Sequence, residues 1–188
     1  MNTKTKKLST VSMVLCGMFA ALVAIGAFIQ IPVPYMDYFT LQFFFVLLAG
    51  LILGADKGAI SVGCYVLLGL VGETIFAAGG GIGYIFRPSF GYLVGFIVSA
   101  YVTGKVCEKL KASYKNYLLA CLAGFVVTYA IGIVYKFIIL NFYAHTPATL
   151  GVIFLSCFPL DMPGDFVLCL LAAGVGLRMR KSGFYLSE

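Results

Sequence analysis

Apolar residues run through the chain in long blocks, which short polar, glycine-rich or proline-rich segments separate. A helix needs about 20 apolar residues to cross a bilayer core, and the blocks lack the alternation that a membrane β-barrel requires. The pattern predicts an all-α integral membrane protein with six transmembrane helices. The expected spans are residues 9–30, 41–54, 59–76, 83–103, 116–141 and 150–177, the last of them broken by Pro159 and Pro163.

The composition leads to the same class of protein. Of the 188 residues, 62% are hydrophobic and 11% are charged, whereas a soluble domain carries about 25% charged residues. A soluble protein of this size could not bury that much apolar surface. We expect a single six-helix membrane domain over residues 1–188, with a tail at 1–8, a basic loop at 104–115 and a second tail at 178–188.

The basic residues set the expected orientation. If the N-terminus is cytoplasmic, eleven of the 13 lysine and arginine residues fall on the cytoplasmic side, and Arg87 and Lys136 fall toward the outside. The positive-inside rule then places both termini in the cytoplasm. The net charge of +6 is thereby explained by membrane topology, and we expect no nucleic-acid partner.

The outer half of the predicted bundle holds unusual polar residues. Asp165 would lie about 20 Å from the cytoplasmic edge, at about 1.5 Å per residue, and a charge at that depth indicates a cavity or a charged partner. Arg87 follows a glycine run and could bind an anion or pair with Asp165 or Glu73. Lys136 is expected to extend to the interface, and we interpret His145 as a solvated loop residue.

Catalytic and cofactor motifs are missing. The sequence contains no GxxxxGK[ST], HExxH or GxSxG motif, so no enzyme class gains support and no cofactor or metal is expected. The six cysteines form no CxxC pair and are interpreted as small packing residues. We interpret the glycine run at 79–83 as a loop over an outward-facing pocket, with a plain connector as the alternative.

Small residues four apart recur in the first span. Ala20 and Ala24 form one such pair, and Gly17 and Ala21 form a second. Small side chains let helices approach closely in lipid. The pairs therefore indicate either packing inside the bundle or a docking stripe for another subunit.

Six blocks appear in order along the chain: IPVP at 31–34, TLQ at 40–42, LAGLILGADKG at 48–58, YVLLGLVG at 65–72, PSFGYLVGF at 88–96, and GD at 164–165. Each block alone is weak, but their order resembles the BioY family, the biotin-specific S-components of energy-coupling factor (ECF) transporters. The resemblance extends over residues 31–177.

The resemblance implies a six-helix S-component in the plasma membrane of a bacterium. It implies capture of biotin in an outer pocket, beneath the loops after the first and third helices. It also implies a separate membrane coupling protein and two ATPase subunits, which explains the missing ATP motifs. Ala20 and Ala24 match the AxxxA stripe with which the family docks to its coupling protein.

One departure from the family pattern bears on the ligand. A lysine commonly follows the late aspartate by three residues, but Leu168 stands there. We expect Arg87 to bind the carboxylate instead, and a related acid such as lipoate stays open. The expected substrate-binding residues are Gln42, Gly79, Gly80, Gly81, Tyr84, Arg87, Tyr92 and Asp165.

Two other functions remain as alternatives. A stand-alone secondary carrier would work without partner subunits, although no convincing internal repeat supports it. A membrane enzyme is disfavoured, because no nucleophile, base or metal constellation is present in the sequence.

Overall fold

Helices make up most of the chain. The computed structural model describes residues 9–31, 39–146, 148–157 and 161–183. The helices are α1 (Thr10–Phe28), α2 (Gln42–Leu53), α3 (Ala55–Val71), the 3-10 helix η1 (Ile82–Phe86), α4 (Phe90–Lys109), α5 (Tyr114–Ile138), the π-helix η2 (Ile139–Tyr143), α6 (Leu150–Cys157) and α7 (Asp161–Lys181). This arrangement confirms the predicted helical class.

Four helical segments in the described part of the chain are long and apolar enough to cross a membrane. They are α1, α4, α5 with its η2 extension, and α7. Helix α2 is apolar but shorter. A multi-pass membrane protein is therefore supported, whereas six crossings and the cytoplasmic position of the ends stay predictions.

The sequence predicts that Pro159 and Pro163 break the last span, and the structure has two helices there, α6 and α7. Pro159 lies outside the described residues. Pro163 lies in the first turn of α7, where its missing N–H costs no helical hydrogen bond. Pro163 is thus compatible with a continuous α7, which carries Asp165 in its second turn.

A short strand pair was not predicted. Strands β1 (Gln30–Ile31) and β2 (Phe39–Thr40) pair antiparallel, with Gln30 opposite Thr40. The pair joins the two ends of the connection from α1 to α2. Helix α2 begins two residues after β2, at Gln42.

Helices α4, α5 and α7 each extend further at one end than hydropathy predicts. Helix α4 continues to Lys109 and α5 begins at Tyr114, so most of the predicted basic loop is helical. Ser113 caps α5 by accepting a hydrogen bond from the Asn116 backbone N–H at 3.3 Å. Helix α7 similarly continues to Lys181. Backbone hydrogen bonding continues past the last apolar residue of a span. The end of an apolar run is therefore an imperfect guide to the end of a helix.

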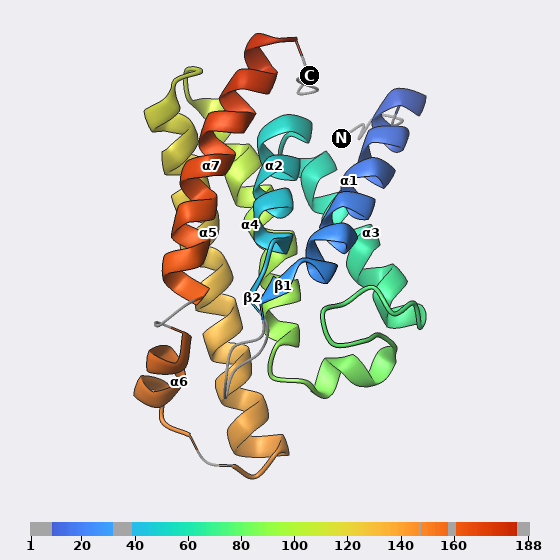
Figure 1. The fold of residues 1–188 in the computed structure, drawn as a ribbon, viewed down its shortest axis with the longest axis vertical. Helices are drawn as coiled ribbons and strands as arrows, with labels where there is room; N and C mark the ends of the chain where they lie inside the picture. Colours follow the sequence, from blue (N-terminus) through green and yellow to red (C-terminus); the bar gives the residue numbers. More distant parts are fainter. Residues whose placement is uncertain (1–8, 32–38, 147, 158–160, 184–188) are drawn as a thin grey trace, which may run out of the picture.

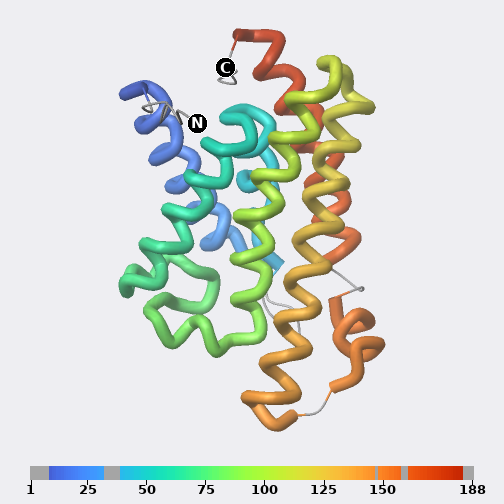
Figure 2. Tube along the Cα trace, turned by 180° about the vertical axis from the view of Figure 1, so that it is seen from behind, coloured from blue at the N-terminus to red at the C-terminus, as the bar shows by residue number. Residues whose placement is uncertain are grey.

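Helix α1 begins and helix α7 ends at the same end of the molecule (Figure 1). The connection from α3 to α4, together with η2 and α6, lies toward the opposite end. Seen from behind, α3, α4 and α5 lie side by side (Figure 2), and α4 packs against both neighbours. Helix α2 contacts α1, α3, α4 and α7, and is therefore the central helix.

The turn between α2 and α3 depends on close backbone contacts. Gly54 has φ 82°, a conformation that suits glycine, and its N–H donates to the Gly50 carbonyl at 3.1 Å. Glu108 of α4 accepts a hydrogen bond from the Ala55 N–H at 2.9 Å. This acceptor satisfies a free N–H group at the start of α3.

Large apolar side chains remain on the outside of the bundle. Val14, Leu67, Val126 and Leu155 are each more than 60% exposed. An apolar exterior of this kind suits lipid rather than water. All six cysteines are free thiols, and every one except Cys64 is buried, which agrees with their interpretation as packing residues.

Candidate ligand-binding site

A pocket lies among α2, α4, α5 and α7, with the loop after α3 and strand β2 completing its wall. It is lined by Phe39, Thr40, Gln42, Phe43, Ala77, Ala78, Tyr84, Ser89, Tyr92, Leu93, Phe96, Tyr129, Lys136, Asp161 and Asp165. Four of the predicted site residues are brought together here: Gln42, Tyr84, Tyr92 and Asp165.

Aromatic side chains form much of the wall. Phe43 and Phe96 stack with ring centroids 6.0 Å apart, and Tyr92 meets Tyr129 edge to face at 5.8 Å. Gly132 lies directly against the Tyr92 ring, where a larger residue would not fit. Rigid aromatic walls with a few placed polar groups are typical of small-molecule sites.

Gln42 is the first residue of α2 and is 4% exposed. The absence of a side chain at Gly26 lets α1 approach its backbone, since a Cβ there would lie 2.9 Å from the Gln42 Cα. The Gln42 Oε1 accepts a hydrogen bond from the Thr40 hydroxyl at 3.2 Å, and its Nε2 donates to the Tyr65 hydroxyl oxygen. The amide is therefore held in one orientation toward the pocket.

Asp165 lies in the pocket wall near the start of α7. Its Oδ2 accepts a hydrogen bond from the Tyr129 hydroxyl at 2.8 Å. The preceding Gly164 makes room for Phe39, whose ring carbon would lie 2.5 Å from an added Cβ. The glycine thus packs β2 onto α7, while the aspartate keeps one oxygen free of Tyr129 to accept from a ligand.

Lys136 lines the pocket, although we expected it to extend to the membrane interface. Among the described residues of the wall, it is the one with a positive charge. Tyr129 was also missed, and it lies two turns before Lys136 on α5. That spacing places both polar residues on one face of an apolar helix, a signal that could have identified them together.

Arg87 does not line the pocket. The side chain is exposed, and its Cζ lies 5.3 Å from the centroid of the Tyr84 ring, in a cation–π arrangement. Tyr84 does line the pocket, so Arg87 contacts the wall from outside.

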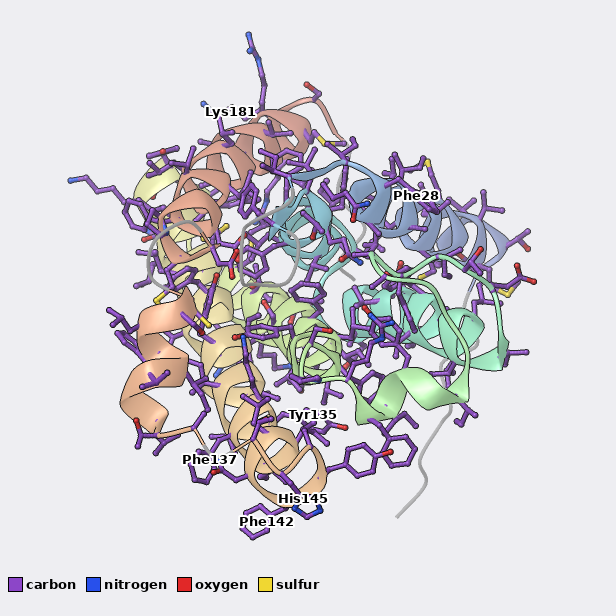
Figure 3. All side chains as sticks on the ribbon, turned by 60° about the horizontal axis from the view of Figure 1, so that its bottom comes forward. Phe28, Tyr135, Phe137, Phe142, His145 and Lys181 are labelled. Atoms are coloured by element: carbon purple, nitrogen blue, oxygen red, sulfur yellow. The ribbon has the colours of Figure 1, made fainter. Side chains whose placement is uncertain are left out.

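Helix α5 supports the same region, because the Tyr135 hydroxyl (Figure 3) donates to the Ile85 carbonyl of η1 at 2.6 Å.

The predicted glycine residues also lie outside the pocket wall. Gly79 and Gly81 have φ 113° and 92°, and Gly81 donates a backbone hydrogen bond to the Gly69 carbonyl at 2.7 Å. Gly80 lies directly against the Glu73 backbone. The run forms a tight turn packed on α3, and the neighbouring residues Ala77 and Ala78 reach the pocket.

The two small-residue pairs of α1 face different ways. Ala20 is 7% exposed and belongs to the core, and Ala24 is partly buried against it. Gly17 and Ala21 are exposed, and no atom beyond the helix itself would contact a side chain at Gly17. The predicted pair thus packs on the bundle, and the second pair faces outward.

The described residues hold no group of three His, Cys, Asp or Glu side chains that could bind a metal ion. The pocket instead offers apolar walls, an oriented amide, two carboxyl groups and an ammonium group. This arrangement suits an amphipathic small molecule with hydrogen-bonding groups and a negative end.

Comparison with known families matches residues 1–183 to the BioY family. A probable biotin transporter BioY from Lysinibacillus sphaericus is 39% identical over 94% of this chain and 90% of the relative. The biotin transporter BioY from Thermotoga maritima is 38% identical over 88% of this chain and 93% of the relative.

A solved structure has a similar fold. It is described as the S-component for biotin from an ECF-type ABC transporter, and it aligns with a TM-score of 0.73 at 22% identity. The alignment covers 98% of this chain and 97% of the other. At this identity the likeness concerns the fold.

Proposed function

The chain belongs to the BioY family, and on that premise we propose that it is the biotin-capturing S-component of an ECF-type transporter. The relatives reported above are named as biotin transporters. Their names support a transporter subunit without catalysis of its own. The membrane-type helices support a multi-pass location.

The observation that carries the proposal is the distribution of polar groups in the pocket. Biotin has a ureido ring with two N–H donors and a carbonyl acceptor, an apolar middle, and a carboxylate at the end of its tail. Gln42 and Asp165 offer an amide and a carboxyl oxygen, Phe43, Phe96 and Tyr92 offer apolar walls, and Lys136 offers a cation. Each part of the ligand therefore has a matching group.

We assign the carboxylate contact to Lys136 rather than to Arg87. The Lys136 side chain lines the pocket, whereas Arg87 is exposed and contacts the Tyr84 ring. The position of the commonly occurring lysine is occupied by Leu168, which is buried. A cation from α5 thus takes the place of one from α7.

Lipoate is the related acid that the sequence left open. It has a carboxylate and an apolar tail, but no ureido group to pair with Gln42 and Asp165. A site built for hydrogen bonding rejects analogues that leave its buried polar groups unpaired. The paired amide and carboxyl groups therefore favour biotin.

Binding by the purified protein tests this function. We expect biotin to bind and lipoate to compete weakly, measured by equilibrium dialysis with radiolabelled biotin. Asp165→Asn should weaken the binding of biotin by about tenfold, because the loss of an acceptor for a buried donor costs about 1–3 kcal/mol. Equal binding of both acids, or wild-type affinity in a folded Asp165→Asn variant, would contradict the proposal.

The energising partners are proposed as a membrane coupling protein and two ATPase subunits. The absence of a phosphate-binding loop from this sequence supports ATP hydrolysis in other chains. A stand-alone carrier would instead transport biotin without these partner subunits. Biotin uptake by cells that express this chain without the coupling module would favour the carrier.

A further inference from the structure

Two loops that border the pocket are tied to the same side chain. The connection from α1 to α2 includes strand β2 (Phe39–Thr40), and the connection from α3 to η1 spans residues 72–81, here called the α3–η1 loop. Both connections contribute to the pocket wall, through Phe39 and Thr40 and through Ala77 and Ala78. Gln42 lies between them.

A chain of hydrogen bonds runs from one loop to the other through Gln42. The Thr40 hydroxyl donates to the Gln42 Oε1 at 3.2 Å, and the Gln42 Nε2 donates to the Tyr65 hydroxyl oxygen at 2.5 Å. The Tyr65 hydroxyl then donates to the Ile75 carbonyl of the α3–η1 loop at 3.1 Å. One Gln42 N–H and one lone pair stay available to a ligand.

The α3–η1 loop is held where Tyr65 meets it. The Phe76 ring lies edge-on to the Tyr65 ring, with centroids 5.5 Å apart at 77°, and occupies the notch at Gly69. Phe76 and Gly79 exchange two backbone hydrogen bonds, at 2.9 and 3.2 Å. This tight turn places Ala77 and Ala78, which lie between them, in the pocket wall.

We propose that Tyr65 is a positioning residue that couples ligand capture at Gln42 to closure of the α3–η1 loop over the pocket. The proposal rests on the proposed function in that biotin is the ligand whose retention reports the coupling. Tyr65 does not line the pocket and is fully buried in α3. It therefore acts through Gln42 and Ile75.

The coupling has a physical basis in the buried chain of hydrogen bonds. Neighbouring hydrogen bonds in a low-dielectric interior polarise and strengthen one another. A ligand that binds Gln42 therefore strengthens the bond to Tyr65 and, through it, the bond to the loop. Without the Tyr65 hydroxyl, the Gln42 N–H and the Ile75 carbonyl lose their partner, which favours an open loop.

The test compares two buried tyrosines. Tyr65→Phe removes the hydroxyl that joins Gln42 to Ile75. Tyr117→Phe is the matched control, because Tyr117 is 1% exposed and its hydroxyl accepts a hydrogen bond from Arg180 at 3.0 Å, away from the pocket. We expect biotin to dissociate about tenfold faster from Tyr65→Phe and at the wild-type rate from Tyr117→Phe.

A second measurement needs no ligand. Ala77→Cys, in a Cys64→Ala background, is labelled with a membrane-impermeant maleimide in the absence of biotin. We expect labelling to be about tenfold faster when Tyr65→Phe is added, and unchanged when Tyr117→Phe is added. A general loss of stability would affect both tyrosine variants, so a difference between them reports the loop.

The outcomes separate this inference from the proposed function. Failure of the wild-type protein to bind biotin would contradict the function, while labelling would still test whether Tyr65 holds the loop. Labelling and dissociation rates in Tyr65→Phe that equal those of Tyr117→Phe would overturn the inference. If Tyr65→Phe does not fold, Gln42→Leu removes the donor to the Tyr65 hydroxyl, and labelling of Ala77→Cys at the wild-type rate in that variant, measured without biotin, would overturn the inference.

Discussion

At the scale of single residues, the chemistry of the pocket depends on which cation reaches it. Lys136 lines the pocket, whereas Arg87 does not line it and contacts the Tyr84 ring. A charge-assisted hydrogen bond contributes about 1.5–3 kcal/mol, whereas a cation–π contact at an exposed position contributes about 0.5–1 kcal/mol. The two residues should therefore affect ligand binding differently.

We predict that Lys136→Met weakens binding of free biotin by about 10-fold to 100-fold. The same variant should bind biotinamide, which lacks the carboxylate, almost as well as the wild-type protein does. Arg87→Met should weaken the binding of both ligands slightly and equally, because Arg87 contacts the Tyr84 ring of the pocket wall and not the ligand carboxylate. Titration of both ligands against both variants checks this prediction, and selective loss of free biotin in Arg87→Met would return the contact to Arg87.

At the scale of the elements, the bundle depends on glycines at helix contacts. Gly50 of α2 faces α4, where an added Cβ would lie 2.5 Å from the Ala100 carbonyl oxygen. Gly63 of α3 faces open space, with no atom within 4 Å of an added Cβ. The two positions differ in surroundings and share a helical backbone.

We predict that Gly50→Ala destabilises the bundle by about 1–3 kcal/mol, because α2 and α4 would be forced apart. Gly63→Ala is the matched control and should leave stability unchanged or slightly higher, since alanine favours helix over glycine by about 1 kcal/mol. Thermal unfolding in detergent measures both. Equal melting temperatures in the two variants would show that the α2–α4 contact can adjust.

At the scale of the whole molecule, α1 presents two different faces. The buried face carries Ala20, and the exposed face carries Gly17 and Ala21. A partner helix can approach closely only where small side chains face outward. We therefore propose Gly17 and Ala21, rather than Ala20 and Ala24, as the place where the coupling protein docks on α1.

We predict that Ala21→Trp leaves biotin binding by the isolated protein unchanged and reduces assembly with the coupling module. Ala20→Trp should instead lower the melting temperature of the isolated protein, because the indole would enter the packed core. Co-purification with the coupling protein and ATP-dependent biotin uptake measure the first effect. Normal assembly and uptake in Ala21→Trp would exclude this face of α1 as the docking surface.

The sequence by itself determined the class of the protein and indicated four residues that line the pocket. Continuous apolar blocks require a lipid environment whatever the helix packing, and the order of the short motifs was sufficient to indicate the BioY family. Gln42, Tyr92 and Asp165 belong to those motifs, and Tyr84 follows the glycine run at 79–83, so the sequence could indicate all four. These features depend on local composition and spacing.

Only the tertiary structure decided which cation lines the pocket, which face of α1 is exposed, and that Tyr65 joins Gln42 to the α3–η1 loop. Each depends on how helices distant in sequence are rotated and packed against one another. A polar residue near a span end can face lipid, water or a cavity, and its hydropathy is the same in all three. Gly132, one turn before Lys136, lets α5 pack directly against the Tyr92 ring of α4, and no single segment of sequence contains such a contact.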